Sequence, residues 1–378
     1  MMAIRHIHRA TLQTWLSTGT PGQSREFALL DLRDEKSFAK GQPLFATNLP
    51  FARLHDEVER LVPRKTVTTV LVDEGNGDAE KAAPILEGLG YSDIAILSGG
   101  IPGWLADSPN GLPTFDIAGN IFTVSVADQQ GTPSLSVKDL KALQDKGEDL
   151  IVLDTRTPPE FAISHIPGSQ NLPAGELLLR FADFVPSAQT LVVVTCAWLA
   201  RAIIGAQTLI AAKVPNRVAY LVEGTQAWAR EGWPLESGEE PQFGACSDAA
   251  AQAGAHYAAN LALQAGVEWI DRDGAAAWLA EPNRTTYLFD VRLLPEYEAA
   301  HLEGTTSSPA GQLLAVSHRT VAVRGARIVL IDDSEGHVRA ITAAYWLKQR
   351  GWDARVYRGT LQDRIPGVRQ EARESVSA

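Results

Sequence analysis

Cys196 and Arg201 place a nucleophile and a cation where a strand is expected to meet a helix. Cys196 follows the apolar run Leu191–Val194, and Arg201 precedes a helical pattern from Ala202 to Ala212. At such a junction, successive backbone N–H groups can form an anion-binding nest, and the helix N-terminus adds partial positive charge. We therefore expect a lowered pKa for the Cys196 thiol and a thiolate that can hold sulfur as a persulfide.

The residues between the cysteine and the arginine are expected to contact that persulfide together with Arg201. They are Ala197, Trp198, Leu199 and Ala200. Two further cations are candidates for the same site. Arg156 follows a strand, and it either braces the Cys196 loop or pairs only with Asp154. Arg180 follows three leucines and either reaches the site or lies on the surface.

Other residues that could do chemistry have simpler explanations. His165 is typical of a turn, and a thiolate of low pKa needs no neighbouring base. Cys246 lies in an Ala-rich stretch, where a relay thiol is the less favoured hypothesis. Gly75–Gly77 lacks the third glycine of a dinucleotide-binding loop, because Glu80 stands at that position.

The elements around Cys196 recur three times along the chain. In each repeat an apolar run ends in Asp-x-Arg, an aromatic residue follows, and a short element then ends in proline. The Asp-x-Arg segments are Asp31–Arg33, Asp154–Arg156 and Asp290–Arg292. Internal repeats of this kind predict a chain of similar structural units.

A second half of the pattern completes each repeat. It consists of an apolar run, a polar loop, a helical segment and a further short strand. The apolar runs are 69–72, 191–194 and 327–331, the helices 79–89, 202–212 and 340–350, and the last strands 94–97, 218–221 and 354–357. Buried strands that alternate with helices are typical of a parallel sheet covered by helices.

The three loops that follow the second apolar run differ in their chemistry. Counting back without gaps from the helix ends at Gly90, Lys213 and Gly351 aligns Asp73, Cys196 and Ser334. Asp73 and Ser334 cannot hold a persulfide. The sequence therefore predicts one thiol site among three related loops.

These repeats predict three α/β domains with linkers between them. A degenerate domain is expected at 1–112, the domain with the nucleophile at 134–238, and a second degenerate domain at 267–369. The linkers are 113–133 and the Ala/Gly-rich 239–266, in which 249–265 is expected to form a helix across the domains, and a tail follows at 370–378.

Length, charge and cysteine content narrow the class of protein. The chain has 378 residues and a formal net charge of −11, which argues against a nucleic-acid-binding surface. Two cysteines exclude a disulfide scaffold or a multi-cysteine zinc module, and we expect no metal and no cofactor. No apolar run approaches the length of a membrane span, and no signal peptide is recognised. A cytoplasmic protein is expected.

The second repeat resembles the rhodanese family of sulfurtransferases. Four segments carry the resemblance: Asp154–Arg156, Glu160–Ser169 with His165-Ile166-Pro167-Gly168, the six-residue loop Cys196–Arg201, and Gly224–Pro234 with Trp228. The first and third repeats look like degenerate copies. The resemblance implies three tandem rhodanese-like domains, each a mainly parallel sheet flanked by helices, and a sulfurtransferase that forms a persulfide on Cys196.

The resemblance also implies the partners of the reaction. A small sulfur donor such as thiosulfate, mercaptopyruvate or polysulfide would load Cys196, and a thiol or cyanide would accept the sulfur. The alternative is a non-catalytic sulfur carrier or an interaction module. No nucleic acid or membrane is expected as a partner, and a homo-oligomer is left open.

The active loop departs from the family's usual pattern. Rhodanese loops usually carry glycine, hydroxyl or charged residues where Trp198 and Leu199 stand, and a hydroxyl residue often occupies the position of Ala202. The mouth of the site should therefore be more apolar than a thiosulfate site, which motivates a bulkier thiol compound as donor. Cysteine-based phosphatases have the loop pattern C-x5-R, which is one residue longer than the loop from Cys196 to Arg201. This loop is therefore too short for the phosphatase pattern.

Overall fold

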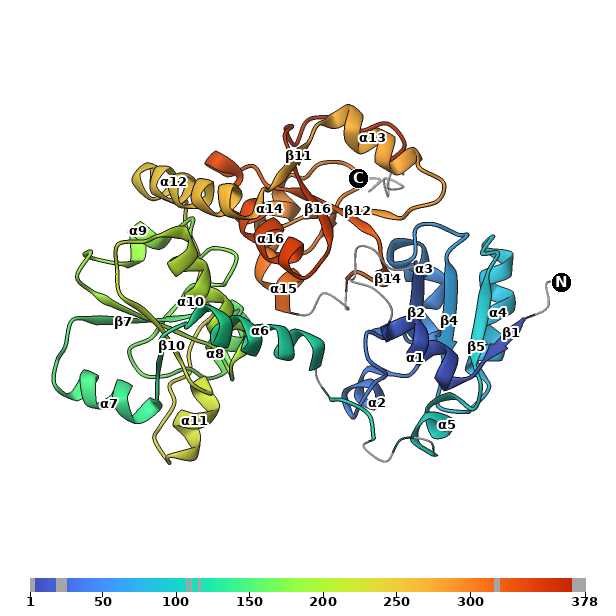
Figure 1. Cartoon of the computed structure of the whole chain (residues 1–378), viewed down its shortest axis with the longest axis horizontal. Coiled ribbons are helices and arrows are strands. Elements are labelled where there is room, and N and C mark those ends of the chain that lie inside the picture. The colour runs from blue at the N-terminus through green and yellow to red at the C-terminus, as the bar shows by residue number, and fades with distance from the viewer. Residues whose placement is uncertain are drawn as a thin grey trace, which may run out of the picture.

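The computed structural model contains three α/β bodies, each built on its own sheet (Figure 1). It describes residues 4–17, 26–106, 108, 111–114, 117–315 and 320–368. The predicted tail at 370–378 lies outside these residues. The fold class is confirmed: the sheets are mainly parallel, and helices flank them.

The first domain contains a sheet of six strands, in the order β1-β5-β4-β2-β14 with β3 also on β2. Its elements are β1 Arg5–Ile7, α1 Arg9–Ser17, β2 Phe27–Asp31, α2 Glu35–Ala39, β3 Thr47–Asn48, η1 Phe51–Arg53, α3 Leu54–Leu61, β4 Thr68–Val72, α4 Asp78–Gly88, β5 Ile94–Leu97 and α5 Gly100–Ala106. Helix α6, Ile117–Gln130, lies in the predicted first linker.

The second domain has five parallel strands in the order β6-β10-β9-β7-β8. Its elements are β6 Ser134–Leu135, α7 Val137–Asp145, β7 Leu150–Asp154, α8 Pro158–Ile163, β8 Gln170–Asn171, α9 Phe181–Phe184, β9 Leu191–Thr195, α10 Ala200–Ala212, β10 Val218–Leu221 and α11 Gly224–Arg230. Helix α12, Asp248–Ala265, confirms the helix expected in the second linker. Valine-rich β9 is buried on both faces, as a central parallel strand must be.

The third domain repeats this order as β11-β16-β15-β12-β13. Its elements are β11 Glu268–Ile270, α13 Arg272–Ala280, β12 Thr286–Asp290, α14 Leu294–Ala299, β13 Thr306–Ser307, α15 Ala310–Ala315, β14 Val323–Arg324, β15 Arg327–Ile331, η3 Glu335–His337, α16 Val338–Gln349 and β16 Asp353–Tyr357.

The second and third domains contact each other through equivalent segments. Gly175 follows Pro173 in one domain and Gly311 follows Pro309 in the other, and a Cβ on Gly175 would lie 3.3 Å from the backbone nitrogen of Gly311. Trp346 on α16 also donates to Thr208 on α10 at 2.8 Å. This close approach brings α15 and α16 next to the loop that begins α10.

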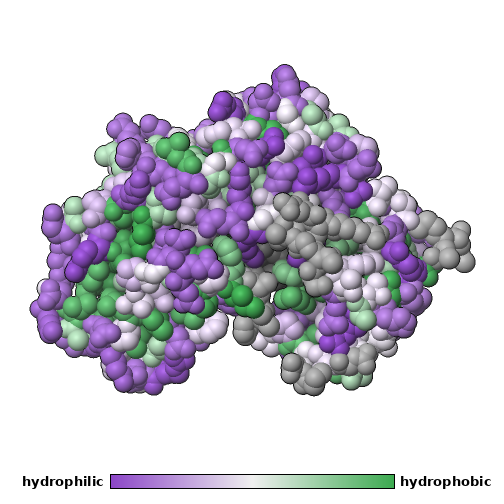
Figure 2. All heavy atoms as spheres, viewed as in Figure 1, coloured by the Kyte–Doolittle hydropathy of each residue, from purple (hydrophilic) through white to green (hydrophobic). Residues whose placement is uncertain are grey.

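One strand from the chain segment of the third domain is part of the sheet of the first domain. Strand β14 lies between α15 and β15 in the chain, yet it pairs antiparallel with β2, where Val323 opposes Ala28 (Figure 1). Tyr287 on β12 donates to the Leu61 carbonyl at 2.6 Å across the same boundary. The surface is polar over most of the face in Figure 2, with hydrophobic residues gathered over the second domain. No helix among the described residues is long and apolar enough to cross a membrane.

Candidate active site

Cys196 is the first residue after β9, and the backbone around it is held from two sides. The N–H groups of Trp198 and Ala202 donate to its sulfur. On the other side, Thr225 donates its N–H to the Cys196 carbonyl at 3.1 Å. Gly224 allows this contact because it has no side chain. Its φ is 45°, and a Cβ there would lie 1.9 Å from the Cys196 carbonyl oxygen. Gly224, the glycine of the sequence motif, therefore lets the chain close in on the Cys196 carbonyl, while the N–H groups of the Cys196 loop point at the sulfur.

The expectation of a lowered pKa for Cys196 is wrong for this structure. The residue is only 3% exposed, and burial raises the pKa of its thiol above the ordinary value. The charge of Arg201 and the two N–H groups lower it, but burial outweighs them. Burial is therefore the larger influence on the pKa of this thiol, although the groups that would stabilise a negative sulfur are already in place.

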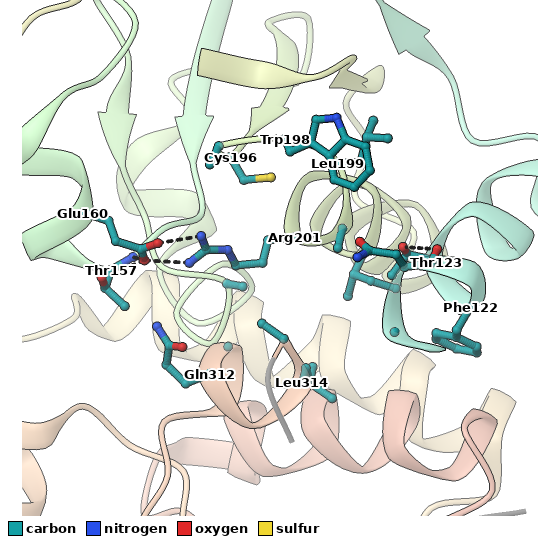
Figure 3. Close-up of a pocket in the computed structure, with 18 of the residues that line it drawn as sticks. Phe122, Thr123, Thr157, Glu160, Cys196, Trp198, Leu199, Arg201, Gln312 and Leu314 are labelled. Atoms are coloured by element: carbon teal, nitrogen blue, oxygen red, sulfur yellow. Dashed lines mark hydrogen bonds and ion pairs between the residues drawn. The ribbon is translucent and has the colours of Figure 1, made fainter. Parts of the chain in front are cut away.

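Arg201 does not present a free positive charge to the sulfur. Its guanidinium donates to both carboxylate oxygens of Glu160, at 2.6 and 2.7 Å (Figure 3). Burial would raise the pKa of Glu160, but Arg201 and the backbone N–H of Thr157 bring it down to about 2. Glu160 thus stays ionised and offsets the cation. The sequence placed Glu160 in a family motif, but its pairing across 41 positions required the fold.

The other two predicted arginines are not brought into the site. Arg156 is buried against Asp154, with its Nη2 2.6 Å from the carboxylate, and also donates to the Ser164 carbonyl. Arg180 pairs with Glu176 at 2.8 Å. Neither side chain lines the cavity that contains Cys196. Their predicted contact with a persulfide is corrected, because nearby carboxylates engage both cations in the fold.

The alignment of Ser334 with Cys196 is also wrong. Strand pairing places Thr195 opposite Asp154 and Ile331 opposite Asp290, so the residue after the strand is Cys196 in one domain and Asp332 in the other. The helices themselves align as counted. The loop of the third domain holds two extra residues between strand and helix, which gapless counting back from the helix end could not detect.

A cavity of about 900 Å³ opens beside the Cys196 loop, and all three domains line it. Every residue from Cys196 to Arg201 lines it. Linker helix α6 adds Phe122 and Thr123, and the third domain adds Gln312 and Leu314 from α15 (Figure 3).

Sequence reasoning missed the cavity residues supplied by the other domains. Phe38 and Gln42 come from the first domain, Trp346 comes from α16, and Arg350 directly follows α16. They stand far from Cys196 in the sequence, and no local motif marks them. Only the docking of the three domains brings them together.

His165 and Cys246, whose chemical roles the sequence left open, both make contacts of a structural kind. His165 stacks on Phe161 with ring centroids 3.8 Å apart, and its Nδ1 lies 2.9 Å from the Phe161 carbonyl. The Cys246 sulfur donates to the Leu179 carbonyl at 3.3 Å, and this cysteine does not line the cavity. The interpretation of His165 as a turn residue fits this geometry.

Comparison with known proteins agrees with the geometry of the strand, loop and helix. The crystal structure of thiosulfate sulfurtransferase from Pseudomonas aeruginosa is similar with a TM-score of 0.86 and 41% sequence identity, over 95% of this chain and 67% of that chain. SseB of Mycobacterium tuberculosis, provisionally named a thiosulfate sulfurtransferase, is 28% identical over 152 residues, which are 35% of this chain. That match spans half the length of SseB.

The family model of the rhodanese-like domain matches residues 12–107 and 136–231, which contain the Asp73 and Cys196 loops. The third domain has the same strand order as the second. Together with the similarity to the Pseudomonas enzyme over nearly all of the chain, these matches confirm the resemblance found in the sequence. The chain belongs to the rhodanese-like family of sulfurtransferases.

Proposed function

We propose that this protein transfers sulfane sulfur from a donor to a nucleophilic acceptor through a persulfide on Cys196. The observation that carries the proposal is the position of the sulfur, which accepts the N–H groups of Trp198 and Ala202 and belongs to a residue that lines a cavity. A terminal persulfide sulfur is a stronger acid than a thiol. It would carry the negative charge that those N–H groups are placed to stabilise.

The transfer would proceed in two displacements. Cys196 loses its proton to solvent as the thiolate attacks the outer sulfur of the donor. With thiosulfate, the sulfur–sulfur bond breaks and its electron pair leaves on sulfite. An acceptor thiolate or cyanide then attacks the terminal sulfur of the persulfide, and the electron pair of that bond returns to Cys196.

Thiosulfate is the donor suggested by the names of the similar proteins, but the cavity favours a larger one. Trp198 and Leu199 form part of its wall, and Arg201 is neutralised by Glu160. A small dianion gains little from such a wall. We therefore include organic thiol compounds and their persulfides among the donors, as the loop sequence suggested.

Intact-mass measurement after exposure to thiosulfate, mercaptopyruvate and polysulfide would test the persulfide. We expect one added sulfur in the wild type, the same adduct in Cys246→Ser, and none in Cys196→Ser. An adduct that persists in Cys196→Ser, or a folded wild type that no donor sulfurates, would overturn the proposal. Turnover to cyanide or a thiol then separates an enzyme from a sulfur carrier. The carrier is the second candidate because Cys196 is almost fully buried.

A further inference from the structure

The second and third domains dock so that corresponding residues of the two repeats contact each other. Gly175 and Gly311 correspond, and a Cβ on either would lie 3.3 Å from the backbone nitrogen of the other. Thr208 on α10 and Trp346 on α16 also correspond, and a hydrogen bond of 2.8 Å joins their side chains. Reciprocal contacts of this kind are typical of a two-fold interface. Each of the two domains therefore offers the same part of its surface to the other.

This docking brings Glu176 of the second domain to the arginine in the first turn of α16. The Glu176 carboxylate accepts from Nε of Arg339 at 2.6 Å and from its Nη2 at 3.2 Å, while Arg180 supplies a second cation. Arg339 also pairs with Asp332 and Glu296. Three carboxylates thus surround the Arg339 guanidinium, and the one from the neighbouring domain occupies its Nε–H.

The corresponding position beside the Cys196 loop holds a neutral amide. Gln312 follows the proline of its repeat at the same spacing as Glu176, and it lines the cavity from α15. Figure 3 shows its amide extending from α15 toward the Arg201–Glu160 pair. Because Gln312 brings no carboxylate, Arg201 pairs with Glu160 alone among the described residues. The cavity therefore lacks the carboxylate that the second domain supplies to the third.

Arg201 keeps one hydrogen-bond donor that no protein group uses. Its Nη1 and Nη2 donate to Glu160, whereas its Nε–H donates to no group in the part of the chain that the structure describes. The residue lines the same cavity as Cys196, and its side chain is 18% exposed. The Nε–H is the donor that Glu176 engages on Arg339. A carboxylate from a ligand would complete on Arg201 the contact that the protein itself makes on Arg339.

We propose that the Nε–H of Arg201 binds a carboxylate of the sulfur donor and that Gln312 keeps this subsite open. The donor is an organic persulfide with one carboxylate, since Glu160 already offsets the charge of Arg201 and a dianion gains less there. In the transfer, Cys196 bonds to the outer sulfur of the donor, the sulfur–sulfur bond breaks, and its electron pair leaves on the donor's thiolate. The kinetic test rests on the proposed function, but the carboxylate subsite does not depend on turnover.

The kinetic test compares the persulfides of N-acetylcysteine and N-acetylcysteinamide, which differ only in a carboxylate and a carboxamide. In Gln312→Glu the new carboxylate should engage the Nε–H of Arg201, as Glu176 does on Arg339. We expect the KM of the carboxylate donor to rise about tenfold and that of the amide donor to change less than about twofold. Exposed Gln189 lies outside the cavity, so Gln189→Glu adds the same charge and should leave both values unchanged.

A binding measurement separates failure of this inference from failure of the persulfide reaction. S-methyl-N-acetylcysteine and its carboxamide cannot transfer sulfur, and calorimetry would measure their Kd values for Cys196→Ser. We expect the carboxylate to bind about tenfold more tightly than the amide, and this preference to disappear when Gln312→Glu is added.

Absence of binding, equal binding of the two ligands to Cys196→Ser, or a preference that persists in folded Gln312→Glu would overturn the inference even if Cys196 forms a persulfide. The comparison of the two ligands in Cys196→Ser needs no change at Gln312, so it decides the question even where Gln312→Glu does not fold. If binding behaves as expected but no donor sulfurates Cys196, the inference holds and the proposed function fails.

Discussion

The Cys196 loop of the second domain and the Asp332 loop of the third share one backbone plan and differ in charge. Each begins after a central strand and ends in a helix whose first turn carries an arginine. In the second domain Arg201 pairs with Glu160, and in the third Arg339 pairs with Glu296 at 2.9 Å in the same arrangement. The arginine–glutamate pair therefore belongs to the fold of these loops rather than to the nucleophile.

The two residues at the strand end use the loop N–H groups differently. Asp332 accepts from the N–H groups of Ser334, Arg339 and Ala340, at 3.0, 2.8 and 3.2 Å. Burial would raise the pKa of Asp332, but the charge of Arg339 and these N–H groups lower it below the ordinary value. For Cys196 the balance is reversed, and burial raises the pKa.

The first domain, like the third, has an aspartate at the end of the central strand. Asp73 accepts from the N–H groups of Gly75 and Ala79, which correspond to those of Trp198 and Ala202 around the Cys196 sulfur. Both of these loops thus hold an aspartate among the N–H groups, where the Cys196 loop holds a thiol. The comparison teaches that one loop backbone can place either a carboxylate or a sulfur at the strand end, with equivalent N–H groups donating to it.

The largest effect is expected when Cys196 is replaced by aspartate, the residue type that the other two loops carry at this position. Cys196→Asp should lower sulfur transfer by at least about a thousandfold, because a carboxylate cannot carry the transferred sulfur. Its carboxylate should accept the N–H groups of Trp198 and Ala202 as Asp73 does in its own loop. We therefore expect the free energy of unfolding, measured in urea, to exceed that of Cys196→Ala. A Cys196→Asp protein less stable than Cys196→Ala would break the comparison.

A large loss of stability is expected when Arg339, in the first helical turn after the Asp332 loop, is replaced. Arg339 is 2% exposed and pairs with Glu176, Asp332 and Glu296. Arg339→Met would leave buried carboxylates without their cation, so we expect a loss of about 3–5 kcal/mol in urea unfolding at neutral pH. Arg201→Met is the matched variant, and its loss should be smaller because Arg201 has one carboxylate partner, Glu160, with a side chain 38% exposed. Equal losses would contradict the difference drawn between the loops.

The repeats, the sheets and the Cys196 loop could be predicted from sequence because each is encoded locally. Strand runs, turn residues and the cysteine–arginine spacing lie within short segments, and their order sets the fold. Asp332 was missed because two extra loop residues leave the helix pattern unchanged. The pairing of β14 with β2 was missed because a two-residue strand has no pattern of its own.

The electrostatics of the site could not be predicted from the loop. The sequence shows the N–H groups and Arg201 that favour a thiolate, but not the burial that opposes it. Glu160 on α8 offsets Arg201 on α10 only after the fold brings these two side chains together. Gln42 reaches the cavity only through the docking of the first domain.

A smaller effect on stability concerns the pair that both loops retain. The pKa of Glu160 falls from 4.5 to about 2 on folding, so its contribution is complete above pH 4.5 and is lost as the pH falls toward 2. Its partial exposure reduces that contribution to about 1–2 kcal/mol through solvent screening. Urea unfolding of Glu160→Gln should show this deficit at pH 7 and almost none at pH 2. A deficit that does not change with pH would show that the carboxylate charge is not its cause.

The smallest expected effect is on the reactivity of Cys196 itself. In Glu160→Gln the charge of Arg201 is no longer offset, and an unopposed cation favours the thiolate. We expect the rate of Cys196 alkylation by iodoacetamide at pH 7.5 to rise about threefold to tenfold, measured in a Cys246→Ser background. Glu296→Gln changes the equivalent pair of the third domain and should leave this rate unchanged. If both variants alter the rate equally, the effect comes from general loosening of the domains. If neither does, the charge of Arg201 does not reach the sulfur, and the loops differ only in the residue at the strand end.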